Sequence, residues 1–283
     1  MDNRLLTTLH AHGKYCDGRG ELEQFVQTAI ERNFRGLGFS SHAPIPVHSD
    51  WTMPEKELPL YLDEIETLKQ RYKGQIDLYT GLEIDYVKGL ISPADARFQK
   101  LKLDFSIGSI HSLYDPQTGK HYCVYGPEEE VEHLINATFR GSSKKMIHAY
   151  YEASRELLAA GGFSFLGHLD LIKKLNKNSR YFDEASGWYR EEIEHTLAVA
   201  REHNRMLEVN TGGIARGYIT EPYPSPWIIE LCGNMGIPLV LNSDAHRHED
   251  IDFHYAETAA IIKKAGCRRL SVLSKNGWEE VLL

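Results

Sequence analysis

The sequence predicts an α/β fold in which parallel strands close into a barrel. Short apolar segments alternate with amphipathic ones along the 283 residues, and strand followed by helix implies parallel pairing with right-handed crossovers. Histidine or carboxylate side chains follow most of the apolar segments. The carboxyl ends of barrel strands meet at one mouth, whereas an open doubly wound sheet collects its site mainly at one switch point. Polar residues after so many strands therefore favour the barrel.

Seven apolar segments have the length and composition of strands. The predicted strands are residues 5–10, 36–40, 76–83, 105–110, 163–166, 206–210 and 239–242. The predicted helices are residues 21–32, 56–72, 93–101, 128–158, 186–203, 226–235 and 255–265. Ser225 and Pro226 form a helix start signal, because the serine can cap free amide groups and the proline supplies a helical φ where its missing N–H costs nothing. Ser92 and Pro93 repeat this device.

We expect residues 1–283 to form a single domain. The length alone permits one large domain or two ordinary ones. The candidate site residues run from His10 to Asp244, and a site that needs both ends cannot be divided between separate domains. A hydrophobic content of 42% allows a sizeable core. The formal net charge of -8 argues against a nucleic-acid backbone as the main partner, since phosphate binding favours a basic face.

The sequence also predicts a cytoplasmic protein with no membrane partner. Its four cysteines are scattered without a CxxC pair, and a chain of this length needs no disulfide to stabilise it. The N-terminus lacks a charged region followed by a long apolar stretch, and no run of about 18 apolar residues occurs. The pattern leaves the oligomeric state open.

The first chemical motif is His10-Ala11-His12. On a strand, residues i and i+2 point to the same side, roughly 6.6 Å apart. Two imidazoles on one side can bind one divalent ion, and His together with Asp and Glu favours zinc, manganese or iron over calcium. A solvent-exposed or hydrogen-bonded histidine pair explains the same two residues, so the prediction depends on the other motifs.

Three carboxylates accompany the histidines. Glu83 closes an apolar run, where a lone buried carboxylate carries a large desolvation cost unless a cation lies against it, and it can bridge two metals. A surface glutamate at the start of a loop is the alternative. Asp244 and His246 follow the apolar run 237–241 and repeat the spacing of two. Asp17 can reach the same ions from the first loop, although Asp-Gly is also an ordinary turn pair.

His42, His111 and His168 complete the candidate ligands, because each follows an apolar run at the end of a predicted strand. Each of them taken alone is also compatible with a structural histidine. Asp170 can fix the tautomer of His168 or cap the stretch 171–175, and the cap is slightly favoured. The remaining histidines are interpreted as surface or packing residues: His48, His121, His133, His148, His195, His203, His248 and His254.

Taken in order, the motifs HxH, CDG, SSHAP, GLEID, GSIH, GHLD, NTGG and NSDAH resemble the polymerase and histidinol phosphatase (PHP) superfamily over nearly the whole chain. Within it, SSHAP, GLEID, Tyr150-Tyr151-Glu152, GHLDLIKK and the ExNTGG segment at residues 208–213 resemble the histidinol-phosphatase branch. The resemblance implies a distorted (β/α)7 barrel with a trinuclear metal site at the C-terminal ends of the strands. The implied cofactors are three divalent ions of zinc, iron or manganese.

The resemblance also assigns roles to residues. One ion would be held by His10, His12, Glu83 and Asp244, a second by Glu83, His111 and His168, and a third by Asp17, His42 and His246. Arg216, which follows the NTGG segment, would bind the substrate phosphate. Its alternative interpretation is a surface arginine in a glycine-rich loop.

The expected function is that of a metal-dependent phosphomonoesterase that acts on a small-molecule phosphate ester, L-histidinol phosphate, in histidine biosynthesis. The implied reaction is in-line attack on phosphorus by a water molecule that the ions activate. One alternative is a related phosphoesterase for a nucleotide, a sugar phosphate or a phosphodiester. Amidohydrolase barrels also use an HxH strand and a late Asp, but no candidate carbamylated lysine ends a strand here. A non-catalytic metal-binding module is a further alternative, against which the full ligand set argues.

Overall fold

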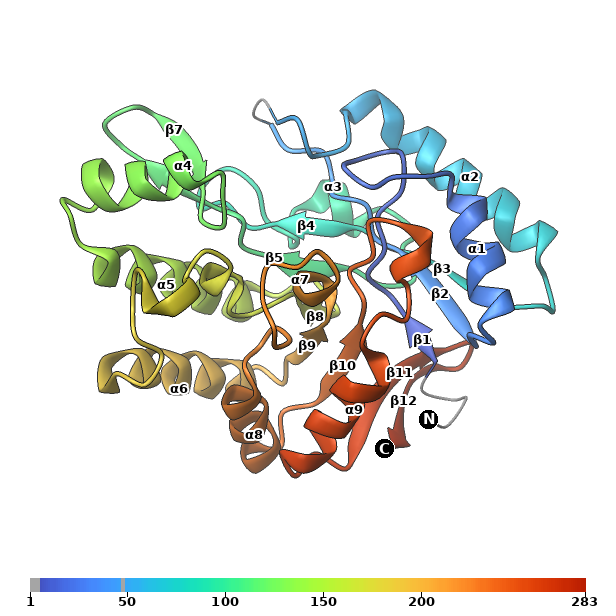
Figure 1. Cartoon of the computed structure of the whole chain (residues 1–283). Helices are drawn as coiled ribbons and strands as arrows, with labels where there is room; N and C mark the ends of the chain where they lie inside the picture. The colour runs from blue at the N-terminus through green and yellow to red at the C-terminus, as the bar shows by residue number, and fades with distance from the viewer. Residues whose placement is uncertain (1–5, 47–48) are drawn as a thin grey trace.

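Parallel strands run through the middle of the computed structural model, and helices cover them from outside (Figure 1). The structure describes residues 6–46 and 49–283. Leu5, the first residue of the first predicted strand, and His48 lie outside the described residues. Within the described residues the chain has the predicted α/β fold.

The parallel strands form a three-stranded and a five-stranded sheet. The first has the order β1 (Thr7–Thr8), β2 (Gly36–Phe39), β3 (Asp77–Thr80), and the second has the order β10 (Leu239–Asn242), β9 (Met206–Asn210), β8 (Phe165–Leu166), β5 (Ile107–Ser109), β4 (Glu83–Asp85). The prediction of one strand at residues 76–83 is wrong, since the chain leaves β3 at Gly81 and enters β4 two residues later. The carbonyl of Gly81 accepts a hydrogen bond from the Tyr61 hydroxyl at 2.8 Å, and the Phe105 ring fills the space that a Cβ of Gly81 would need.

The two sheets meet at two places, beyond the carboxyl ends of β1 and β10 and between the segment after β2 and the start of β4. Ala11 forms an isolated parallel bridge with Ala245, and His42 forms one with Glu83. The amide of His12 donates to the carbonyl of Ala245 at 2.8 Å. These bridges hold together the strand ends that carry the candidate ligands.

Nine α-helices occur within the described residues, at the following positions: α1 (Leu22–Glu31), α2 (Leu58–Arg71), α3 (Ala96–Gln99), α4 (Glu128–His133), α5 (Ser143–Ala160), α6 (Gly187–Glu202), α7 (Gly212–Ala215), α8 (Pro226–Met235) and α9 (Tyr255–Lys264). Helix α8 has the predicted bounds, with its proline in the first turn. A capping box formed by Glu21 and Gln24 begins α1. Helices α5 and α6 pack side by side (Figure 1), and the hydroxyls of Tyr151 and Tyr189 are hydrogen-bonded between them at 2.9 Å.

Two predicted helices differ from the observed ones. The helix predicted at residues 128–158 is interrupted after a π-helical turn at Leu134–Thr138, because Gly141 has a φ of 78° and Ser142 caps a new helix by accepting from the amide of Lys145. The helix predicted from residue 93 begins at Ala96, since the Asp95 carboxylate accepts from the Ser92 amide at 2.9 Å and holds a turn there.

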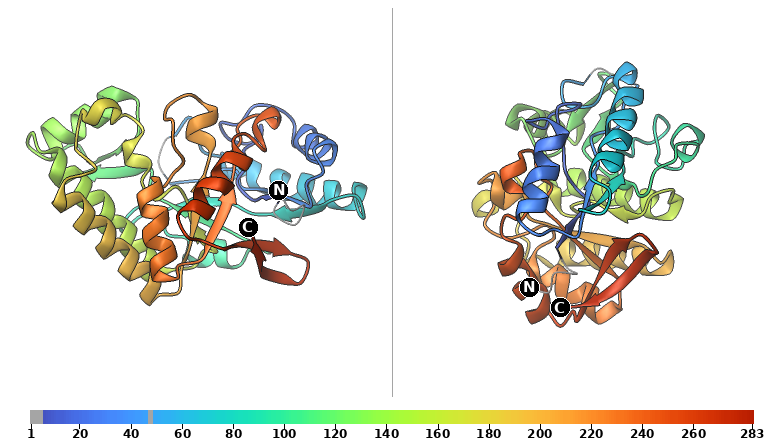
Figure 2. Two further views of the ribbon diagram at one scale, coloured as in Figure 1. Left: turned by 60° about the horizontal axis from the view of Figure 1, so that its bottom comes forward. Right: turned by 90° about the vertical axis from the view of Figure 1, so that its right-hand side faces the viewer.

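Two antiparallel hairpins were not predicted: β6 (Ser112–Asp115) with β7 (Lys120–Cys123), and β11 (Arg269–Ser274) with β12 (Gly277–Leu282). Figure 2 shows that the second hairpin lies at one end of the molecule. There Leu273 packs into an interior cluster with residues from both sheets: Leu9, Tyr79, Phe105, Ile107, Phe165 and Val240. The hairpin therefore covers the end of the sheets opposite the candidate ligands. No helix among the residues the structure describes is both long and apolar enough to cross a membrane.

Candidate metal centre

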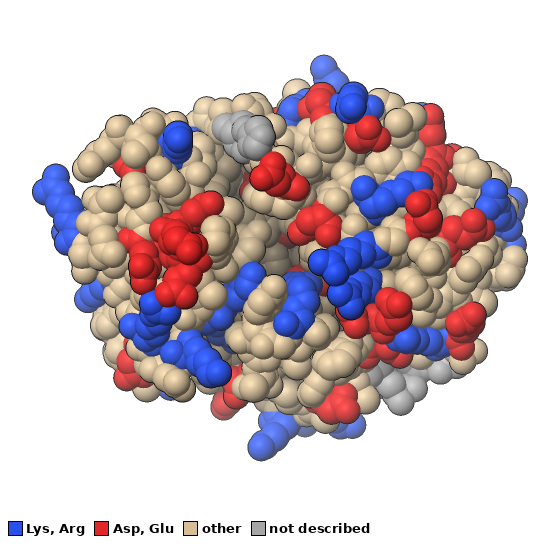
Figure 3. Space-filling view, turned by 45° about the horizontal axis from the view of Figure 1, so that its top comes forward, with Lys and Arg blue, Asp and Glu red and all other residues tan. Residues whose placement is uncertain are grey.

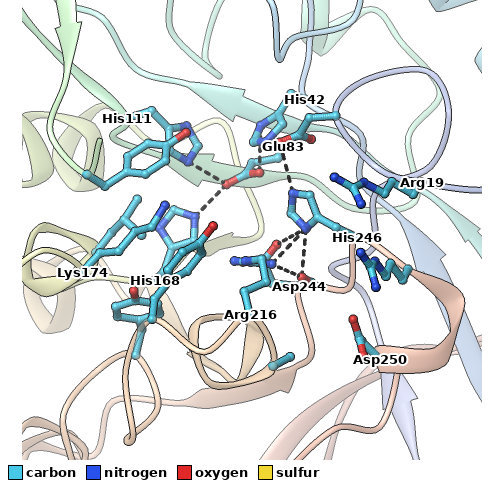
Figure 4. A pocket seen from close by; sticks show the side chains of 17 residues that line it. Arg19, His42, Glu83, His111, His168, Lys174, Arg216, Asp244, His246 and Asp250 are labelled. Carbon is cyan, nitrogen blue, oxygen red and sulfur yellow. Dashed lines mark hydrogen bonds and ion pairs between the residues drawn. The ribbon is translucent and has the colours of Figure 1, made fainter. Parts of the chain in front are cut away.

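Glu83, the first residue of β4, lies at the centre of a buried group of histidines (Figure 4). Its Oε2 atom is 3.2 Å from Nε2 of His10 and 3.5 Å from Nε2 of His12. Its Oε1 atom is 2.9 Å from Nε2 of His168 and 3.4 Å from Nε2 of His111. The two carboxylate oxygens therefore face two different pairs of imidazoles, which is the arrangement of a carboxylate able to bridge two cations.

The surroundings of Glu83 keep its carboxylate charged. Complete burial on its own would raise the pKa of Glu83, but His42, His10 and His111 hold this pKa well below its usual range. Ser109 adds a hydrogen bond from its hydroxyl to Oε1 at 2.6 Å. A buried anion of this kind is stable only among positive charges or hydrogen-bond donors.

Asp244 approaches the HxH pair from the end of β10. Its Oδ1 atom is 3.6 Å from Nε2 of His10 and 3.4 Å from Nε2 of His12. Burial, together with the nearby His246 and His42, lowers the pKa of His12 to about 3. His12 is therefore a neutral imidazole near pH 7 and can offer a lone pair to a metal. The structure brings together the four residues predicted for the first ion.

The residues predicted for the third ion also converge. Oδ2 of Asp17 is 3.2 Å from Nε2 of His246, and its Oδ1 is 3.7 Å from Nε2 of His42. The ring of His246 stacks on that of His12, with centroids 4.3 Å apart. Gly18 allows the loop to fold this closely, because a Cβ there would lie 2.0 Å from the carbonyl oxygen of His12.

The donor atoms of this cluster suit divalent ions. Among the described residues, Nε2 of His12 and Nδ1 of His42 are buried without a hydrogen-bond partner, and both atoms face Oε2 of Glu83. Unpaired buried polar atoms are costly, and a cation held between imidazole and carboxylate would satisfy them. Imidazole with carboxylate is a donor set for zinc, iron or manganese. The residues thus fit such ions, and their division among individual ions stays a prediction.

Sequence reasoning missed the buried carboxylates that orient the histidines. Glu208 of β9 is 2.7 Å from Nδ1 of His10 through Oε1, and its Oε2 accepts from the backbone amide of His168 at 3.0 Å. Asp85 is 2.6 Å from Nδ1 of His111. Such contacts direct Nε2 of both imidazoles toward the carboxylate of Glu83. The sequence does contain a signal for Glu208: it is a glutamate within an apolar strand, where its carboxylate needs buried partners.

The predicted roles of Asp170 and Ser225 are wrong. Asp170 neither caps the following turn nor contacts His168, because its Oδ2 lies 2.9 Å from Nζ of the buried Lys173. Ser225 does not cap α8 with its side chain. Its hydroxyl donates instead to Oε2 of Glu184 at 2.8 Å. The need to compensate a buried lysine has thus overridden the local capping preferences.

Arg216 lies in the pocket wall, next to the cluster. Its guanidinium donates to Oδ2 of Asp244 at 2.8 Å and to the carbonyl oxygen of the same residue at 2.7 Å. Arg216 is half-buried and directly follows the last residue of α7. The alternative interpretation of Arg216 as a surface arginine is therefore wrong. Its role in binding phosphate stays a prediction.

The cluster forms the floor of a cavity of about 540 Å³. Figure 3 shows this face of the molecule hollowed, with Lys and Arg side chains along one edge of the hollow. Lys174, another residue without a predicted role, lies with Nζ 4.0 Å from the ring centroid of Tyr218 and 4.7 Å from that of Tyr125. Burial and the nearby Arg216 lower the pKa of Lys174 to about 8. The cavity is thus suited to a small anion.

The other described histidines lie outside the cluster, as predicted. His133 is 2.8 Å from Oδ2 of Asp115, and His148 lies against Glu192 on the α5–α6 surface. None of the described residues in this group lines the cavity: His121, His133, His148, His195, His203, His248 and His254.

Comparison with known proteins gives consistent matches. A model of the PHP domain family matches residues 8–212. The "Probable histidinol-phosphatase" of Deinococcus radiodurans is 29% identical over 93% of this chain and 94% of its own length. The "Histidinol-phosphatase" of Bacillus subtilis is 29% identical over 87% and 95%. The crystal structure of histidinol phosphate phosphatase from Lactococcus lactis, complexed with zinc, L-histidinol and phosphate, shares the fold with a TM-score of 0.69, at 20% identity over 97% of this chain and 99% of that one.

Proposed function

This chain belongs to the PHP domain family, and we propose that it is a metal-dependent phosphatase that hydrolyses L-histidinol phosphate to L-histidinol and inorganic phosphate, a step of histidine biosynthesis. The observation that carries the proposal is the position of Glu83, whose two oxygens face separate histidine pairs at the floor of a cation-lined cavity. The histidinol-phosphatases of D. radiodurans and B. subtilis support the choice of substrate. So does the Lactococcus enzyme, which was crystallised with zinc, L-histidinol and phosphate.

The proposal includes the architecture of the centre. The two parallel sheets would act as one distorted seven-stranded barrel and one domain, with β3 and β4 as a single interrupted strand. The bridges of Ala11 to Ala245 and of His42 to Glu83 support this closure. Three ions would be held by the three sets of residues predicted from the sequence. The convergence of these sets on Glu83, Asp244 and Asp17 supports that number.

Divalent ions bound in this cluster would lower the pKa of water and neutralise charge on the phosphoryl group. The protein's own residues bind and orient the ester. Lys174 and the free N–H groups of Arg216 donate hydrogen bonds to the phosphate oxygens, and they stabilise the negative charge that develops there in the transition state. Glu208 and Asp85 keep the imidazoles of His10 and His111 in fixed orientations.

A panel of phosphate esters tests the proposed function. The zinc-loaded enzyme is expected to hydrolyse L-histidinol phosphate with a kcat/KM about 100-fold above those for p-nitrophenyl phosphate, a hexose phosphate and bis-p-nitrophenyl phosphate, since a site that pairs the polar groups of its substrate discriminates strongly. Phosphate release is measured alongside the metal content of the protein. Preference for another ester would assign the chain to a different phosphoesterase. Absence of turnover with all of them would favour a non-catalytic metal-binding module.

Lys174 predicts a pH dependence of substrate binding. Because its pKa is lowered to about 8, the side chain is mainly charged below pH 8 and loses its proton above it. The KM for a phosphate monoester is therefore expected to rise about tenfold between pH 7 and pH 9.5, as one charged hydrogen bond to phosphate is lost. The Lys174→Arg variant stays charged and should show a smaller rise. Lys144, which lies over the Trp188 ring away from the cavity, provides the matched control as Lys144→Arg. Identical KM profiles for wild type and Lys174→Arg would contradict this role.

A further inference from the structure

The charges of the cavity pose a problem for an amino-alcohol phosphate. L-Histidinol phosphate carries an ammonium group on the carbon next to its ester carbon, so the cavity has to accept a cation beside the phosphate. The cavity is lined by four side chains that bear or can bear positive charge in addition to the histidines: Arg19, Lys174, Arg216 and Arg247. These residues attract phosphate but repel an ammonium group. The ammonium therefore requires a carboxylate that the metal cluster does not already use.

Asp250 is such a carboxylate. Four acidic residues line the cavity, and three of them, Asp17, Glu83 and Asp244, lie against histidines of the cluster. The side chain of Asp250 makes no hydrogen bond or ion pair with any residue that the structure describes. Burial raises the pKa of Asp250, and the nearby Arg247 only partly offsets this. Its negative charge is thus incompletely compensated, and a cationic ligand would compensate it.

Asp250 is held in place by the structure around it. It ends the short 3-10 turn η6 (His248–Asp250), which follows β10 and His246. Thr28 of α1 is hydrogen-bonded to Nδ1 of His248 at 2.8 Å, and the guanidinium of Arg32 donates to the carbonyl oxygen of Glu249 at 2.8 Å. Figure 4 shows Asp250 on the side of the cavity that also carries Arg19 and His246. A carboxylate on an anchored turn loses little conformational freedom when it binds a ligand.

We infer that Asp250 is a specificity-determining residue that binds the ammonium group of an amino-alcohol phosphate substrate. The inference rests on the proposed function. With its phosphate at the metal cluster and its ammonium group at Asp250, the substrate is held at both of these groups, which only a few bonds separate. Esters with an amine next to the ester carbon are thereby selected over simple alkyl phosphates.

The test compares L-histidinol phosphate with 3-(imidazol-4-yl)propyl phosphate, which has the same three-carbon chain and lacks only the amine. Wild-type enzyme is expected to favour the amine ester by about tenfold or more in kcat/KM. In Asp250→Asn the KM for the amine ester rises about tenfold, equivalent to about 1.4 kcal/mol, while its kcat and both constants for the deaminated ester change less than about twofold. Glu249→Gln is the matched control, because Glu249 belongs to the same turn, is 62% exposed and does not line the cavity. It should behave as wild type with both esters.

The outcomes separate this inference from the proposed function. Equal hydrolysis of the two esters by the wild-type enzyme overturns the ammonium site and leaves the phosphatase assignment intact. An equal loss on both esters in Asp250→Asn also overturns it, since that pattern indicates a structural role. The wild-type comparison needs no variant, so it can overturn the inference even if Asp250→Asn does not fold. Failure of the zinc-loaded wild type to release phosphate from either ester would instead overturn the proposed function.

Discussion

Replacement of Glu83 by glutamine is expected to lower kcat for L-histidinol phosphate by about 1,000-fold or more and to reduce the bound metal. Glu83 is the residue whose two oxygens face both histidine pairs, so its charge is needed at two places at once. Glutamine has nearly the same volume but only one acceptor oxygen and no charge. The loss therefore removes the electrostatic stabilisation of ions and substrate without leaving a cavity. Turnover and metal content, measured on the same preparation, test the expectation.

The fold of this variant is expected to survive. Glu83 contributes to stability at neutral pH, because its histidine neighbours hold its pKa below the usual range, and its removal leaves those imidazoles without their partner. The metal-free Glu83→Gln protein should therefore unfold at a lower temperature than the metal-free wild type, but still in a cooperative transition. Glu192→Gln is the control, since Glu192 also lies against a histidine and an arginine but at the α5–α6 surface. A Glu83→Gln protein with wild-type kcat and full metal content would contradict the proposed mechanism.

The convergence of the residues at the candidate metal centre could be predicted because their signal is local. His10 and His12 are two apart on a strand, and Asp244 and His246 repeat that spacing at the other end of the chain. Glu83 follows an apolar run, which makes a buried anion conspicuous. The histidines and Asp244 follow the ends of β1 and β10, whereas Glu83 begins β4, and the fold brings these positions together whatever the details of the helices.

The partners of those residues could not be predicted, because they depend on contacts between distant segments. The carboxylate of Asp170 pairs with Lys173, and not with His168 or a helix end, because the Lys173 side chain is buried and needs a partner. The predicted strand at residues 76–83 has the right apolar pattern, but Tyr61 and Phe105, which interrupt it, come from other elements. The C-terminal hairpin lies outside the repeating strand and helix pattern, and only the interior cluster around Leu273 explains its position.

Replacement of Glu208 is expected to have the second large effect, a loss of metal affinity. Its carboxylate contacts Nδ1 of His10, the backbone amide of His168 and the side-chain amide of Asn242, at 2.7, 3.0 and 2.9 Å. It does not line the cavity and so does not touch the substrate. Glu208→Ala is expected to weaken zinc binding about 10- to 100-fold, because the imidazole of His10 loses the acceptor that fixes its tautomer and orientation.

The role of Glu208 can be distinguished from a catalytic one by the dependence on metal concentration. In a competition assay with a chelator, Glu208→Gln should bind zinc more tightly than Glu208→Ala, since the amide oxygen still accepts one of the hydrogen bonds. At saturating zinc, kcat of Glu208→Gln should return to within about tenfold of wild type, because the residue acts only through its partners. Unchanged zinc affinity in Glu208→Ala, or a kcat that excess zinc does not restore in Glu208→Gln, would show that the carboxylate has another role. The result therefore also tests whether the contact of Glu208 with Nδ1 of His10 is needed for tight metal binding.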